Sequence, residues 1–282
     1  MNVIIKNEFC TATINTKGAE LISFKSNNRE YIWEGNPEFW GKHSPILFPI
    51  VGTLKENQFQ YLEETYSLSR HGFARDMEFN IKEESENSVT FSLEASEETL
   101  KNYPFTFELL LIYTLEGQKL TLHYKVFNKD KKEMPFSIGA HPAFALPKRF
   151  DNYSLSFNDD NELSYFLLEN DLLSNRTESI SLKDHELPLK YELFERDALV
   201  FKHINSKSIT INENSKPILK VECKDFPNLG IWTKVNAPFI CIEPWFGYSD
   251  TNKNSGKLAE KEGILLLEAD NVFDCEFSIE IK

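Results

Sequence analysis

The chain has 282 residues, of which 41% are hydrophobic and 27% charged, and its formal net charge is −13. This acidity disfavours nucleic acid and anionic membrane surfaces as partners, because like charges repel. The four widely spaced cysteines include no Cys-x-x-Cys pair, which argues against a zinc site, a redox motif or a disulfide scaffold. The chain starts without an apolar leader and has no run of about 18 apolar residues, so we expect a cytoplasmic protein.

Apolar residues recur with a period of two along most of the chain, which is typical of β-strands. One short helix is expected at 96–103, with Ser96 as its N-cap and Pro104 as its stop. The other elements expected are strands at 89–93, 105–115, 119–126, 153–157, 208–211, 218–223, 230–233, 239–242, 264–267 and 275–281. So many strands without strand–helix alternation predict an all-β sandwich or barrel, in a single domain spanning 1–282.

Three segments interrupt the strand pattern and carry reactive side chains. In the first of them, 70–76, His71 precedes a glycine and lies between Arg70 and Arg75. The glycine allows a sharp bend that presents the imidazole beside two guanidinium groups. An exposed polar turn is the alternative interpretation, and for an isolated histidine in such a context it is the commoner one.

The other two segments are 137–144 and 239–248. In the former, His141 precedes Pro142, which favours extended backbone at the histidine; a core histidine with satisfied nitrogens is the alternative. In the latter, Glu243 ends an apolar strand. A buried carboxylate must be paired or have a raised pKa, and such groups are enriched at functional sites, although structural ion pairs produce them too.

Taken together, these segments resemble the aldose 1-epimerase (galactose mutarotase-like) superfamily, in particular its LacX-like branch, over essentially the whole length. Any one motif is weak, but their order along the chain is that of the family. The segments that carry the resemblance are Lys17–Phe24, Tyr31–Gly35, Phe39-Trp40, Pro45–Gly52, the His-Gly-Phe-Ala-Arg run at 71–75, the Gly-Ala-His-Pro-Ala-Phe run at 139–144 and the Cys-Ile-Glu-Pro-Trp run at 241–245.

The resemblance implies a large antiparallel β-sandwich, the galactose mutarotase-like supersandwich, with a site in a cleft on one sheet. It implies that Glu243 is a general base, His141 a general acid, and His71 a group that orients the sugar near its ring oxygen. The implied activity is the interconversion of α and β anomers of an aldohexose, with no metal or organic cofactor. The absence of a nucleophile motif such as G-x-S-x-G agrees with acid–base chemistry that needs no covalent intermediate.

Further residues are candidates for substrate binding. Aromatic side chains can stack on a sugar, although core packing is expected for at least half of them. Asp225 is a candidate ligand and, together with Glu222, the nearest alternative base if Glu243 is not the base. The complete set of substrate-binding candidates is Arg75, Arg70, Trp40, Phe48, Trp245 and Asp225.

Two other functions stay open. Hexose-6-phosphate mutarotases use arginines for the phosphate, and Arg75 and Arg70 fit that role. Their second arginine normally lies just before the Pro-x-x-F-P stretch, where this chain has Lys42-His43-Ser44. A lysine lacks the paired N–H donors of an arginine, so we favour a free sugar over a sugar phosphate as the substrate. Pro244, where galactose mutarotases have threonine, also puts the substrate's identity in doubt. The other possibility is a non-catalytic carbohydrate-binding protein on the same fold. The sequence indicates no oligomeric state.

Overall fold

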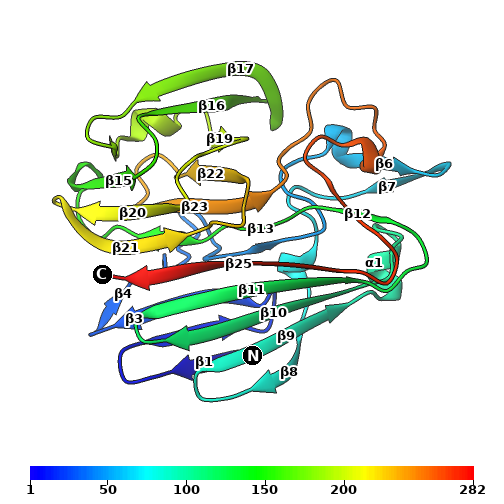
Figure 1. Ribbon diagram of the computed structural model, residues 1–282, viewed down its shortest axis with the longest axis horizontal. Helices are drawn as coiled ribbons and strands as arrows, with labels where there is room; N and C mark the ends of the chain where they lie inside the picture. The colour runs from blue at the N-terminus through cyan, green and yellow to red at the C-terminus, as the bar shows by residue number, and fades with distance from the viewer.

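A computed structural model describes residues 1–282, and nearly all of its regular secondary structure consists of antiparallel strands (Figure 1). The predicted all-β fold is therefore confirmed. The only α-helix is α1 (Glu97–Leu100), and no helix is long and apolar enough to cross a membrane. Single 3-10 turns occur at η1 (Lys55–Asn57), η2 (Ala74–Asp76), η3 (Phe150–Asn152), η4 (Tyr191–Phe194) and η5 (Leu258–Glu260).

The larger of the two main sheets has nine strands. The C-terminal strand lies in its middle, paired on both sides, so the end of the chain is held by both neighbours (red in Figure 1). In sheet order its strands are β18 (Glu186–Pro188), β15 (Tyr153–Phe157), β20 (Ser208–Glu213), β21 (Lys216–Glu222), β25 (Val272–Ile281), β11 (Lys119–Asn128), β10 (Phe107–Glu116), β9 (Ser88–Glu94) and β8 (Asn80–Glu84).

The second main sheet has eight strands and carries most of the candidate site. Its central strand, β23, pairs with β22 on one side and with β13 and β14 on the other. Its strands are β17 (Leu172–Ser181), β16 (Glu162–Glu169), β19 (Leu199–Phe201), β22 (Asn228–Trp232), β23 (Phe239–Phe246), β13 (Ile138–Ala140) and β5 (Ile46–Leu47), with β14 (Ala143–Ala145) on the side.

Three small sheets complete the fold. The first is formed by β1 (Asn2–Lys6), β2 (Thr11–Asn15), β3 (Glu20–Ser26) and β4 (Arg29–Glu30), the second by β12 (Met134–Phe136) and β24 (Leu265–Leu267), and the third by β6 (Gln58–Tyr61) and β7 (Glu64–Ser67).

The two main sheets pack against each other through aromatic side chains. Phe246 of β23 meets Phe273 of β25 edge-on, with ring centroids 5.0 Å apart. Because side chains alternate along a strand, Ile240 and Ile242 share the face of Phe246 and belong to the same apolar core. The opposite face of β23 carries Cys241, Glu243 and Trp245. Both faces of this strand are buried, which explains its nearly continuous apolar sequence.

The strands predicted at 105–115 and 119–126 are confirmed as β10 and β11, which form a hairpin and pair in register from Phe107↔Asn128 to Glu116↔Lys119. The helix is shorter than predicted. Its start is right, because Ser96 and Thr99 form a capping box, but the helix ends at Leu100 and not at 103. Tyr103 is fully buried, and its hydroxyl donates to the carbonyl of Pro135, so tertiary packing takes over from the local helical signal.

Candidate active site

A cavity of about 340 Å³ opens on the face of the eight-stranded sheet that is turned away from the core. This volume lies within the range of small-molecule sites, of about 300–1,000 Å³. The residues lining it come from six separate segments and are Trp40, Arg70, His71, Arg75, His141, Asp197, Ala198, Trp232, Glu243 and Trp245. All three predicted catalytic residues are therefore brought together.

Strand β23 supplies the carboxylate and one aromatic wall. Glu243 and Trp245 are two residues apart, so their side chains leave the same face. Trp245 pairs with Gly139 on β13, while Gly230 on β22 pairs with Glu243. A side chain on either glycine would overlap the indole, so these two residues allow the ring to lie flat across the neighbouring strands. The indole is 5% exposed and forms a rigid wall of the cavity.

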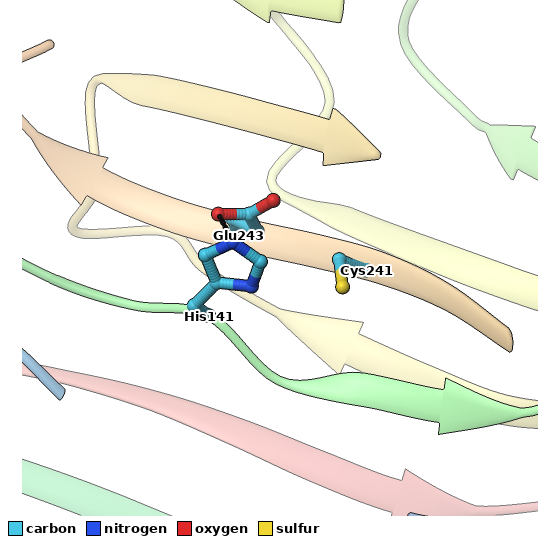
Figure 2. A group of neighbouring side chains, drawn as sticks. All are labelled: His141, Cys241 and Glu243. Atoms are coloured by element: carbon cyan, nitrogen blue, oxygen red, sulfur yellow. Dashed lines mark ion pairs between the residues drawn. The ribbon is translucent and has the colours of Figure 1, made fainter. Parts of the chain in front are cut away.

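His141 lies in the connection between β13 and β14, directly before Pro142. Its backbone N–H donates to the carbonyl of Pro45, which holds the segment in place at 3.1 Å. The ring stacks on Trp40, with centroids 4.8 Å apart. This leaves Nε2 of the imidazole 3.2 Å from Oε2 of Glu243, as Figure 2 shows. Acid and base are thus in direct contact before any substrate enters.

Burial acts on both members of this pair. It lowers the pKa of His141 to about 3, and the positive charges of Arg70 and Arg75 act in the same direction. It raises the pKa of Glu243 well above 4.5, although Arg70 opposes this change. We therefore expect the pair to hold one proton in all, since both a doubly protonated and a fully deprotonated pair would leave a net charge in a dry site.

His71 lies on a sharp turn, where it and Gly72 both adopt positive φ, of 68° and 71°. A side chain at Gly72 would overlap the carbonyl of Phe48, which explains the glycine after the histidine. The N–H of Gly52 donates to Nδ1 of His71 at 3.1 Å. Burial lowers the pKa of His71 well below 6.5, helped by His141 and the two arginines. The second ring nitrogen, Nε2, accepts from Nε of Arg70 at 3.3 Å. A neutral imidazole accepts at only one nitrogen, so Gly52 and Arg70 compete for that single acceptor site.

The two arginines line the cavity, as predicted, but they differ in role. The guanidinium of Arg75 donates from Nη2 to the backbone carbonyl of Arg70 at 2.7 Å. Its Nε is buried without a hydrogen-bond partner and lies 3.6 Å from Asp76. Arg75 thus supports the turn that carries Arg70. The Arg70 side chain is 40% exposed and pairs through Nη1 with Asp171 at 3.1 Å.

Asp197 and Trp232 line the cavity and were missed in the sequence. Asp197 precedes β19 with a φ of 81°, and its Oδ1 accepts from the N–H of Ala198 at 2.7 Å. The available signal was a carboxylate directly before a short apolar strand, of the kind that drew attention to Glu243. Trp232 ends β22 and meets His141 edge-on, with centroids 5.8 Å apart.

Two predicted substrate ligands are wrong. Phe48 is fully buried in the core between the sheets, where its ring centroid lies 5.0 Å from that of Phe107. Asp225 lies in the connection between β21 and β22, and its Oδ2 accepts from the N–H of Glu276 on β25, in the other main sheet. Neither residue lines the cavity. Of the three aromatic candidates, Trp40 and Trp245 line the cavity and Phe48 is a core residue.

One set of side chains in the site has the composition of a metal centre. His141, Cys241 and Glu243 each offer a ligand atom within 4.8 Å of the others (Figure 2). A thiol must lose its proton to bind a metal, and burial raises the pKa of Cys241 well above 9.0. A metal would also occupy the two atoms that face each other in the His141–Glu243 pair. The set therefore suits proton transfer better than metal binding.

Comparison with known proteins agrees with this geometry. Residues 1–265 match the family model described as aldose 1-epimerase. Protein LacX (plasmid) of Lactococcus lactis subsp. lactis is 38% identical over 277 residues, which cover 93% of each chain. The structure of a galactose mutarotase related enzyme from Lactobacillus acidophilus superposes with a TM-score of 0.95 at 32% identity, covering 100% of this chain and 97% of that one.

A galactose mutarotase-like protein from Lactobacillus casei ATCC 334 gives a TM-score of 0.94, also at 32% identity, with both chains covered completely. These two superpositions confirm the galactose mutarotase-like sandwich that the sequence motifs implied. The family match spans all three predicted catalytic residues. The chain therefore belongs to the aldose 1-epimerase family and is an isomerase of the mutarotase type.

Proposed function

We propose that the protein interconverts the α and β anomers of an unphosphorylated aldohexose by opening and closing its ring. The observation that carries this proposal is the 3.2 Å contact between Nε2 of His141 and Oε2 of Glu243 in the cavity wall. In a cyclic sugar the anomeric hydroxyl oxygen and the ring oxygen are bonded to the same carbon. An acid and a base that act on them together must therefore lie side by side, as these two do.

The proton accounting follows from a pair that holds one proton. In the ionic form, the Glu243 carboxylate takes the proton of the C1 hydroxyl while the His141 imidazolium gives its proton to the ring oxygen. The bond between C1 and the ring oxygen breaks, and the open aldehyde forms. The pair then has a neutral carboxyl and a neutral imidazole, so it still holds one proton. Rotation about C1–C2 and the reverse transfers close the ring on the other face, and each positioned group contributes roughly 10²–10⁴-fold.

The remaining lining residues suit a neutral sugar. Nε2 of His71 accepts from Nε of Arg70 in the free site. When a sugar displaces that contact, the tautomer whose Nδ1 accepts from Gly52 presents an Nε2–H donor to the ring oxygen or a neighbouring hydroxyl. Asp197 has one carboxylate oxygen engaged by Ala198 and the other available to accept from a hydroxyl. The indole rings of Trp40 and Trp245 offer flat apolar walls against which C–H faces of the sugar can pack.

A sugar 6-phosphate is the second candidate, because two arginines line the cavity. The segment before Pro45, where the hexose-6-phosphate enzymes have their other arginine, does not supply a free cation here. Lys42 pairs with Asp76 at 3.1 Å, and the backbone N–H groups of His43 and Ser44 donate to Glu20. None of these residues lines the cavity, which favours the free sugar.

Mutarotation of freshly dissolved α-D-glucose and α-D-galactose, followed by polarimetry, tests the proposal. Their 6-phosphates are compared by exchange NMR at anomeric equilibrium. We expect wild-type protein to accelerate at least one free sugar well above the rate in buffer, and the His141→Asn variant to lose most of that acceleration. A wild-type protein that accelerates only the 6-phosphates would overturn the substrate assignment. One that accelerates none of the four would overturn the function.

A further inference from the structure

The contact between Arg70 and Asp171 at the mouth of the cavity has no part in the proton transfers described above. Arg70 lies on the turn that carries His71, whereas Asp171 belongs to the tip of the hairpin between β16 and β17. Their Nη1 and Oδ1 atoms are 3.1 Å apart, and their side chains are 40% and 58% exposed. Segments about a hundred residues apart in the sequence thus meet at the entrance through one ion pair.

The hairpin tip is held in position by the fold. Asn170 and Asp171 both adopt positive φ, of 52° and 65°, which gives a tight turn between the strands. Two residues further on, Leu173 is 1% exposed, and its N–H donates to the carbonyl of Asp250 at 2.8 Å. Because this anchor follows the turn so closely, Asp171 is directed to the edge of the Arg70 guanidinium.

The other cations near the mouth also have carboxylate partners. Arg75 and Lys42 both approach Asp76, at 3.6 and 3.1 Å. Asp197 adds a carboxylate to the cavity without a cation of its own. An anionic substituent on a sugar therefore meets arginines whose charge is already compensated, and it must compete with Asp171 for the most exposed of them.

We propose that Asp171 is a specificity-determining residue, which occupies the guanidinium edge of Arg70 and thereby favours neutral aldohexoses over aldohexoses that carry a phosphate at C6. This inference rests on the proposed function, because it takes from it that the cavity binds aldohexoses. Arg70 is the group through which Asp171 acts, because a guanidinium can bind a carboxylate or a phosphate with the same pair of N–H donors. Removing the carboxylate leaves that edge available to the phosphate.

The substitution Asp171→Asn tests the proposal, because asparagine tolerates the same positive φ and removes only the charge. Isothermal titration calorimetry with D-glucose, D-galactose and their 6-phosphates gives, for each sugar, the ratio of the dissociation constant of the 6-phosphate to that of the free sugar. An exposed ion pair is worth roughly 0.2–1 kcal/mol, so we expect the ratio to shift about 1.4–5-fold towards the phosphate. Affinity for the free sugar should change by less than the ratio does. Phosphate binding by the variant should also weaken more steeply with added salt.

Asp270→Asn is the matched control. Asp270 also adopts a positive φ, of 60°, and pairs with an exposed lysine, Lys131, at 3.4 Å, but it does not line the cavity. Its substitution changes the net charge equally and should leave the ratio unchanged. In an Arg70→Gln background, Asp171→Asn should give no further shift, since the group through which it acts is absent.

An unchanged ratio in Asp171→Asn, or an equal shift in Asp270→Asn, would overturn the inference. A shift that persists in the Arg70→Gln background would assign the effect to general charge and would also overturn it. These binding measurements do not depend on turnover. A wild-type protein that mutarotates free sugars but shows no shift in the variant contradicts only the role of Asp171. A shift in a protein without mutarotase activity contradicts only the proposed function.

Discussion

Replacing Glu243 with glutamine removes the carboxylate while keeping the volume and the hydrogen-bonding capacity of a side chain that is 2% exposed. The loss of activity can be worked out from the proton held by the pair. Without the carboxylate, His141 must be charged by itself to act as the acid, and its pKa is about 3. At neutral pH, about four units higher, roughly one molecule in 10⁴ carries the imidazolium. We therefore expect kcat to fall by roughly 10²–10⁴-fold, or about 2.7–5.4 kcal/mol.

This origin of the loss has its own pH signature. The activity of Glu243→Gln should rise about tenfold for each unit by which the pH is lowered towards the pKa of His141, whereas wild-type activity should not. Polarimetry across pH gives kcat for both proteins, and thermal unfolding confirms that the variant is folded. Asp225→Asn is the matched control, because that carboxylate lies against β25 outside the cavity. Wild-type turnover in Glu243→Gln would refute the assignment of the base. A loss without acid dependence would refute the shared-proton reasoning.

Three further outcomes are expected. In the wild-type protein, the acid limb of the pH profile of kcat/KM should lie at about 3, the pKa to which burial lowers His141. The alkaline limb should lie well above 4.5, because burial raises the pKa of Glu243. An acid limb at 4.5 or above contradicts the pairing. Mutarotation should survive dialysis against EDTA, because both facing atoms of the pair serve in proton transfer; activity that returns only with a divalent ion would contradict this. Arg75→Ala removes a hydrogen bond to the carbonyl of Arg70, so KM for a free hexose and for its 6-phosphate should rise by a similar factor, roughly 10-fold. A loss confined to the phosphate would show direct binding.

Much of the fold could be predicted because, in a strand with one buried face, apolar and polar residues alternate along the sequence. The pair β10 and β11 does so over ten residues each. Strand β17 escaped prediction for the opposite reason. In β17 the run from Asn175 to Ser181 has no buried residue, so its sequence lacks an apolar period. Exposed strands at a sheet edge are held by backbone hydrogen bonds, which leave little trace in residue types.

The site could be predicted where a reactive side chain and a residue that fixes the backbone conformation, such as glycine or proline, stand side by side in the sequence. His71 needs a glycine after it, and His141 is followed by a proline, so both positions leave local marks. Asp197 and Asp171 lack such marks, because they reach the cavity and its mouth through contacts between distant segments. The errors have the same origin. Whether Phe48 faces the core or the cavity depends on which side of the sheet it leaves, and Asp225 is near Glu243 in sequence but belongs to a connection that turns to the other sheet.

Strand β23 contributes one face to the apolar core and the other to the active site. No hinge or linker separates the base from the packing that supports the fold, so a shift of the backbone at Ile242 also displaces the carboxylate of Glu243. Heat inactivation and global unfolding should consequently occur in a single transition, with no folded but inactive species between them. The same coupling restricts where this enzyme can acquire a new substrate preference. Changes along the strand endanger the whole protein, whereas the hairpin tip at Asp171 can vary at little thermodynamic cost.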